Sequence, residues 1–191
     1  MTKIAIVYHS GYGHTRRQAE AVAAGVTKAG ATVHLLAINH ETGDLATGDW
    51  DVLQNADGII FGSPTYMGSV SWQFKKFADA SSKPWFGRAW KDKFAAGFTN
   101  SASMNGDKFL TISYLMTLAM QHGMAWVGLD TLPANTKTAT RNDLNNIGGF
   151  SGALMQTPAD ASVDEMVQGD LDTATVLGDR FAKFVKAHKA A

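Results

Sequence analysis

The chain has 191 residues, of which 45% are hydrophobic and 18% charged, and this length suits one well-buried domain, 1–191, better than two. Its formal net charge is zero, which argues against nucleic acid or an anionic membrane surface as the main partner. The absence of cysteine excludes disulfides, thiolate nucleophiles and iron–sulfur clusters, so an organic cofactor would have to carry any electrons that the protein transfers.

Short apolar runs alternate with segments of helical periodicity, which is typical of a parallel sheet with crossover helices. The expected strands cover residues 4–8, 32–38, 58–62, 93–99 and 124–127. Helices are expected at 15–29, from Trp72 through Phe77, at 108–122 and at 163–187, with both named aromatic side chains in the core. Residues 39–55 carry no clear pattern, and 128–160 form a long turn-rich segment of the kind that is often functional. Five strands separated by crossovers predict a doubly wound α/β fold with helices on both faces.

The loop between the first strand and the first helix carries the clearest functional signal. It is Ser10-Gly11-Tyr12-Gly13-His14-Thr15. Backbone N–H groups and the positive end of the helix dipole make such a loop a good anion site. Because the loop contains no lysine, a phosphate would be held by main-chain donors and the hydroxyls of Ser10 and Thr15. An ordinary strand-to-helix turn capped by Thr15 is the alternative interpretation.

Two better-known phosphate loops are excluded by the sequence. A Walker A loop needs a Gly-Lys pair, and the chain contains none. A dinucleotide fingerprint needs a third glycine where this chain has Arg16.

Two further loops should meet this one at the carboxyl edge of the sheet, because right-handed crossovers bring the ends of parallel strands together. The loop at 64–68 is rigid at Pro64, flexible at Gly68, and offers backbone N–H groups. The loop at 100–106 is made of small polar residues that let the backbone approach a flat ring. Together the three loops predict one ligand site.

With these motifs the chain resembles the flavodoxin-like NAD(P)H:quinone oxidoreductases of the WrbA (tryptophan-repressor-binding-protein A) type. The family motif S-x-Y-G-H-[IT] appears at 10–15, F-G-[ST]-P-T at 61–65, H-G-M at 122–124 and a Gly-Gly-x-x-Gly turn at 148–152. The resemblance implies a five-stranded sheet of order 2-1-3-4-5 and a homodimer or homotetramer. It also implies FMN-dependent transfer of a hydride from NAD(P)H, through flavin N5, to quinones or similar two-electron acceptors.

The resemblance further implies roles for individual residues. Tyr12 and Trp85 would flank the nicotinamide or quinone stacked on the flavin, and His122 would approach the flavin or its substrate face. Structural roles stay open for two of them: Trp85 in the core, and His122 at the end of a helix. The residues implied to bind FMN are Ser10, Gly11, Tyr12, Gly13, His14, Thr15, Pro64, Thr65, Tyr66, Met67, Gly68, Asn100, Ser101, Ala102, Ser103 and Asn105.

The chain departs from the family motif in two of the loops. Where the family has the glycine-rich S-T-G-T-G-G, this chain has Asn100-Ser101-Ala102-Ser103-Met104-Asn105. The family's Thr-Arg-Phe is here Thr65-Tyr66-Met67, which removes a positive charge near the ring.

Other classes of function give different expectations. A flavodoxin-type electron carrier would have an acidic docking face, and a family member that binds no flavin would act only as an interaction protein. The remaining histidines show no metal-ligand spacing, so no metal site is predicted. A strand at the very N-terminus leaves no room for a signal peptide, and no apolar run reaches membrane-spanning length, so the expected location is the cytoplasm.

Overall fold

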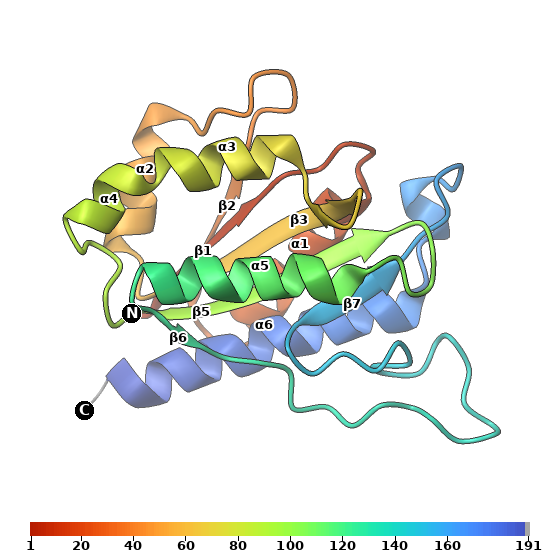
Figure 1. Ribbon diagram of the computed structural model, residues 1–191. Coiled ribbons are helices and arrows are strands. Elements are labelled where there is room, and N and C mark those ends of the chain that lie inside the picture. Colours follow the sequence, from red (N-terminus) through yellow and green to blue (C-terminus); the bar gives the residue numbers. More distant parts are fainter. Residues whose placement is uncertain (190–191) are drawn as a thin grey trace.

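A parallel sheet lies between two layers of helices in the computed structural model, which describes residues 1–189 (Figure 1). The strands in this part of the chain are β1 (Lys3–Tyr8), β2 (Thr32–Ala37), β3 (Gly58–Tyr66), β4 (Ser69–Val70), β5 (Phe94–Ser101), β6 (Ala125–Trp126) and β7 (Ala153–Gln156). The helices are α1 (His14–Lys28), α2 (Thr47–Asn55), α3 (Trp72–Ala80), α4 (Ser82–Phe86), α5 (Lys108–Gln121) and α6 (Gln168–Lys189), with a 3-10 turn η1 at Val163–Glu165.

The main strand order is β2-β1-β3-β5-β6, and all of these pairs are parallel. The predicted flavodoxin-like sheet of order 2-1-3-4-5 is therefore confirmed. Two strands were not predicted. β4 pairs antiparallel with the end of β3, and β7 lies within the segment 128–160 that was expected to consist of turns.

The last position of the sheet is shared between two short strands. β6 pairs with Phe94 and Ala95 at the start of β5, whereas β7 pairs with the residues from Phe98 to Ser101 at its end. The chain between them, 127–152, leaves the sheet and returns, and this is why the turn-rich segment is long. β7 consequently delivers the residues that follow it to the same carboxyl edge as the other loops.

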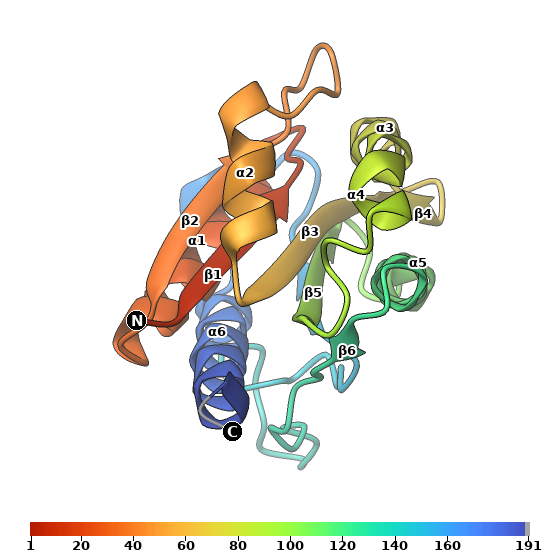
Figure 2. The same ribbon diagram turned by 90° about the vertical axis from the view of Figure 1, so that its left-hand side faces the viewer.

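The two faces of the sheet bury different layers of helices, as alternation along β1 shows. Ile4 and Ile6 face a core with α1 and α6, whereas Ala5 and Val7 face a core with α2, α3 and α5 (Figure 2). Within the second core, Phe77 is buried as predicted. The prediction for Trp72 is wrong: it is 56% exposed, because it is the first residue of α3 and lies over Gly43 at the surface.

Two further differences concern helix boundaries. The unassigned stretch 39–55 contains α2, and the last helix begins at Gln168 rather than 163. The residues before it form η1, whose start is fixed by reciprocal hydrogen bonds between Ser162 and Glu165. No helix within residues 1–189 is both long enough and apolar enough to span a bilayer.

Helices α1 and α6 cross in backbone contact at two glycines. A Cβ atom at Gly178 would overlap the carbonyl oxygen of Val22, and one at Gly25 would overlap that of Thr175. Side chains at these positions would force the helices apart. The crossing thus sets the position of α1, whose first turn borders the predicted phosphate site.

We expect Gly178→Ala to lower the free energy of unfolding by about 3 kcal/mol, because overpacking at a close backbone contact cannot relax without separating the helices. Urea denaturation measures this change. The control is Gly48→Ala in α2, where an added Cβ meets nothing within 4 Å, and which should raise stability by up to about 1 kcal/mol. Equal effects of the two substitutions would show that the crossing does not constrain the fold.

Candidate functional site

The loop after β1 is closed by the side chain of Ser10. Its Oγ accepts hydrogen bonds from the backbone N–H groups of Gly13 and Arg16, both at 3.1 Å. Gly13 adopts a φ of 91° as the residue before α1, a conformation that favours glycine. Within residues 1–189, no acceptor takes the N–H groups of His14 and Thr15, which begin the 15-residue helix. Free N–H groups at a helix start form an anion site.

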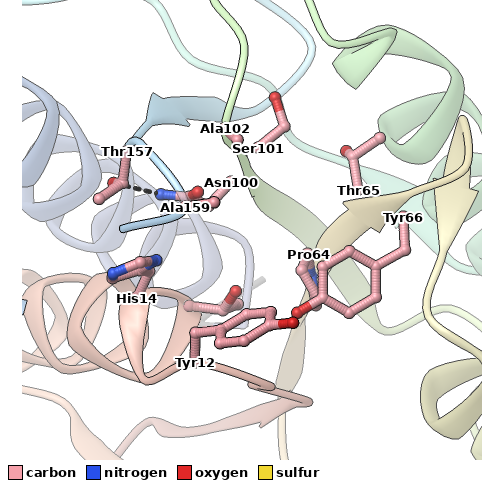
Figure 3. A pocket seen from close by; sticks show the side chains of 11 residues that line it. Tyr12, His14, Pro64, Thr65, Tyr66, Asn100, Ser101, Ala102, Thr157 and Ala159 are labelled. Carbon is pink, nitrogen blue, oxygen red and sulfur yellow. Dashed lines mark hydrogen bonds between the residues drawn. The ribbon is translucent and has the colours of Figure 1, made fainter. Parts of the chain in front are cut away.

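A pocket of about 120 Å³ lies where this loop meets the two other predicted loops (Figure 3). The predicted convergence of the loops at one site is therefore observed. The residues that line the pocket are Tyr12, His14, Thr15, Pro64, Thr65, Tyr66, Asn100, Ser101, Ala102, Thr157 and Ala159.

Most of the predicted cofactor-binding residues thus border one pocket. The others belong to the same three loops without lining the pocket itself: Ser10, Gly11, Gly13, Met67, Gly68, Ser103 and Asn105. Thr157 and Ala159 were missed, because their position depends on β7, whose four residues were not recognised as a strand. The run Ala153-Leu154-Met155 was the only signal for it.

Two tyrosines stand at the mouth of the pocket. Tyr12 is 73% exposed, and its ring meets that of Tyr66 edge-on with centroids 6.4 Å apart. Figure 3 shows the hydroxyl ends of both side chains directed toward each other. A Cβ atom at Gly11 would overlap the Tyr66 hydroxyl, so this close approach requires glycine. Burial, reinforced by Tyr12, raises the pKa of the Tyr66 phenol, which therefore keeps its proton at neutral pH.

Several polar side chains around the pocket are already bonded within the protein. Thr65 Oγ1 lies 2.8 Å from the hydroxyls of both Thr99 and Thr111, which joins β3, β5 and α5. His14 Nε2 lies 2.8 Å from the carbonyl oxygen of Ala161. Asn100 Nδ2 donates to Thr157 Oγ1 at 2.8 Å. These contacts shape the pocket and leave mainly backbone groups and exposed hydroxyls for a ligand.

The turn between β3 and β4 contains a strained residue. Met67 and Gly68 have φ angles of 47° and 79°, the pattern of a two-residue hairpin turn of type I′. The first position of such a turn favours Asn, Asp or Gly, yet here it holds Met, whose side chain is fully exposed. Strain at the edge of a pocket is a feature of functional sites.

The structure does not bring His122 and Trp85 to the pocket. The crossover helix α5 carries the chain from the carboxyl edge of the sheet back to the amino edge, where it ends next to α4 (Figure 1). His122 is there, 2% exposed, with Nε2 2.9 Å from Ser81 Oγ and its ring 4.1 Å from that of Trp90. Trp85 lies in α4 and is 42% exposed. Neither residue lies at the pocket of its own chain, and the roles predicted for them at the flavin stay predictions.

His122 occupies the C-cap of α5, as the alternative interpretation expected. Burial, with a smaller effect of Arg88, lowers its pKa to about 4, so the ring is uncharged at neutral pH. A second buried ring, His9, stacks on His40 with 3.1 Å between Nε2 and Nδ1. Burial and His40 lower the pKa of His9 to about 4. Residues 1–189 contain no group of three or more His, Cys, Asp or Glu placed to hold a metal ion.

Comparisons with known proteins agree with this arrangement. A family model described as NADPH-dependent FMN reductase matches residues 2–139. A protein named Flavodoxin FldP from Pseudomonas aeruginosa is 50% identical over 183 residues, 96% of each chain. An NAD(P)H dehydrogenase (quinone) from Archaeoglobus fulgidus is 30% identical over 96% of this chain and 97% of the relative. The crystal structure of a WrbA-like flavodoxin from Agrobacterium tumefaciens has a TM-score of 0.79 at 48% identity, covering 98% of this chain and 99% of that one.

We expect Met67→Asn to raise the free energy of unfolding by about 0.5–1 kcal/mol, because Asn tolerates a positive φ that costs other side chains about 1–2 kcal/mol. Urea denaturation measures the change. The control is Met104→Asn, at a half-exposed methionine without a positive φ, which should stay within about 0.5 kcal/mol of the wild type. A loss of stability in Met67→Asn would show that the methionine side chain itself stabilises the turn.

Acid should destabilise the protein through its two buried histidines. In the unfolded chain each ring takes up a proton near pH 6.5, but in the folded protein only near pH 4. Their contribution is therefore complete above about pH 6.5 and declines as the pH falls toward 4. Urea denaturation between pH 6 and 4.5 should show a slope that His122→Phe reduces by up to about 1.4 kcal/mol per pH unit. An unchanged slope would mean that His122 protonates in the folded state.

Proposed function

The chain belongs to the NADPH-dependent FMN reductase family, in its flavodoxin-like WrbA type, and from that premise we propose that it is an FMN-dependent NAD(P)H:quinone oxidoreductase. One observation carries the proposal. His14 and Thr15, whose N–H groups have no acceptor within residues 1–189, line the pocket at which the three predicted loops meet.

The phosphate of FMN fits the start of α1. A dianion there would accept from the N–H groups of His14 and Thr15, and the hydroxyls of Ser10 and Thr15 lie in the same loop. The described residues that line the pocket carry no carboxylate that would repel it. The helix dipole adds to this attraction. The donor set thus suits a phosphate group without a lysine.

The size of the pocket favours a flavin ring at its rim. A cavity of about 120 Å³ is smaller than the roughly 300–1,000 Å³ of sites that enclose a small molecule. The ring system would then lie outside, against the exposed side chains of Tyr12 and Met67. An open ring face is what an enzyme needs if a nicotinamide and an acceptor must use the same face in turn.

The chemistry that FMN supplies when bound is two-electron transfer from a reduced nicotinamide to an acceptor. The protein's residues would contribute binding and orientation. Backbone N–H groups of the loops at 66–68 and 102–105 would donate to ring oxygens and nitrogens, and Tyr12 would form a wall for the stacked substrate. His14 would have a structural role, because its Nε2 is hydrogen-bonded to the carbonyl of Ala161.

Roles for Trp85 and His122 at a flavin would require a second subunit. Both lie at the amino edge of the sheet (Figure 1). Trp85 is 42% exposed and could contact the pocket of another chain, whereas His122 is buried and would act there only through the residues that cover it. A homodimer or homotetramer is accordingly part of the proposal. A location in the cytoplasm stays a prediction.

A second candidate is a flavodoxin-type electron carrier without enzyme activity. The relative that is 50% identical is named as a flavodoxin, which favours this reading. The zero net charge of the chain disfavours it, because a carrier would need a charged docking face.

The two functions differ in their response to NADPH. We expect the purified protein with added FMN to be yellow, to lose the flavin colour within the first equivalents of anaerobic NADPH or NADH, and to regain it when a benzoquinone is added. Absorbance spectroscopy follows each step, and free FMN with NADPH is the control. Bleaching by dithionite through a half-reduced state, with no response to NADPH or NADH, would support the carrier. A protein that binds no FMN would contradict both functions.

A further inference from the structure

The loop after β5 has its backbone carbonyls turned toward donors of the protein. The carbonyl oxygen of Ser101 accepts from the N–H of Thr157 at 3.1 Å, and that of Ala102 accepts from Gln156 Nε2 at 2.7 Å. The next carbonyl, of Ser103, accepts from Ser101 Oγ at 3.0 Å. β7 and the residue after it therefore hold the first half of the loop.

A buried lysine holds the second half. Lys108 is 1% exposed, and its Nζ donates to the carbonyl oxygens of Ser103 at 2.6 Å, Met104 at 2.8 Å and Asn105 at 3.4 Å. These bonds use all three donors of the ammonium group. A buried charge is costly unless it is satisfied in this way. The loop is thus folded around the lysine.

The N–H groups of this loop differ from its carbonyls, because they have no acceptor in the described part of the chain. Within residues 1–189, no acceptor takes the N–H groups of residues 102–105, and all four residues are exposed. Ala102 also lines the pocket beside α1. Successive free N–H groups in a curved loop form a concave site for electronegative atoms.

The charged groups near Lys108 come from two other segments. Asp170 of α6 favours the protonated lysine, and Arg141 of the 127–152 segment opposes it. These two groups pair with each other at 2.5 Å, and Asp170 also accepts from the N–H of Gln156 at 3.0 Å. Burial lowers the pKa of Lys108 to about 8, so the ammonium is mostly charged at pH 7.

We propose that Lys108 is a positioning residue for FMN: its ammonium group gathers the carbonyls of 103–105 so that the N–H groups of 102–105 are presented to the flavin ring. It would do here what glycines do in the family motif S-T-G-T-G-G. This inference rests on the proposed FMN site. Lys108 need not touch the cofactor to act in this way.

Lys108→Met keeps the length of the side chain and removes the charge and its donors. We expect the dissociation constant of FMN, measured by flavin fluorescence on the apoprotein, to rise by about ten- to a hundred-fold, which corresponds to the loss of about one hydrogen bond to a charged group. In the apoprotein, chymotrypsin should cut more rapidly at Met104, Phe109 or Leu110, which are all at least half exposed.

Lys93→Met is the matched control. Lys93 Nζ also donates to backbone carbonyls, of Leu53 at 3.0 Å and Gln54 at 2.5 Å, and burial lowers its pKa to about 8 as well. It lies at the amino edge of the sheet, just before β5. This variant should lose stability without changing FMN affinity or cleavage at 104–110.

A pH profile separates the positioning role from a general loss of structure. As the pH rises through about 8, FMN affinity of the wild type should fall, because the ammonium loses a proton and one of its donors. Lys93→Met should keep this dependence, and Lys108→Met should lack it. If Lys108→Met does not fold, the profiles of the other two proteins decide the question.

The outcomes distinguish this inference from the proposed function. Equal FMN affinity of Lys108→Met and the wild type, or a flat profile between pH 7 and about 9 in the wild type, overturns the positioning role alone. A wild-type protein that binds no FMN overturns the proposed function, and the positioning role with it.

Discussion

Backbone N–H groups surround the pocket, and they are free for a ligand only where other bonds hold each loop in shape. In the loop after β1, Ser10 Oγ takes two N–H groups and leaves those of His14 and Thr15 at the helix start. In the turn after β3, positive φ angles at Met67 and Gly68 set the backbone direction. In the loop after β5, Lys108 takes the carbonyls. The binding surface is produced by bonds that lie behind it.

Helix α6 links these loops although it lies outside the pocket. Its contact with α1 at Gly178 fixes the helix that starts at the phosphate loop. Near its N-terminus, Asp170 accepts from the N–H of Gln156, whose side chain in turn holds the carbonyl of Ala102. The same helix therefore positions the first loop through close packing and the third loop through a chain of hydrogen bonds.

Sequence patterns were sufficient for the parts of the molecule that depend on local order. Buried runs gave the five main strands, and the rule that parallel strands end at one edge brought Tyr12, Thr65 and Asn100 to one pocket. They failed where the outcome depends on tertiary pairing. β7 is only four residues long and is a strand because β5 offers it a free edge beyond β6.

The position of His122 also depends on the fold. A crossover helix reverses the direction of the chain across the sheet, so a residue at the end of α5 lies far from the loop that precedes the helix. Lys108 was missed for a different reason. A lysine at a helix start is usually a solvated side chain, and only the folded loop shows that its ammonium is enclosed.

Either a buried lysine or a set of glycines can let the loop after β5 present its backbone N–H groups to a ligand, but the two have different consequences for the order of the loop. Glycines allow a tight loop but leave it many conformations, which must be lost when a ligand binds. A loop folded around an ammonium group is ordered beforehand, and its residues need not be glycine. Positions 102–105 can therefore carry side chains, of which Met104 is half exposed. Where the family motif has glycines, this chain has the exposed side chains of residues 102–105. On the proposed function, these side chains would contact the substrate that approaches the flavin ring.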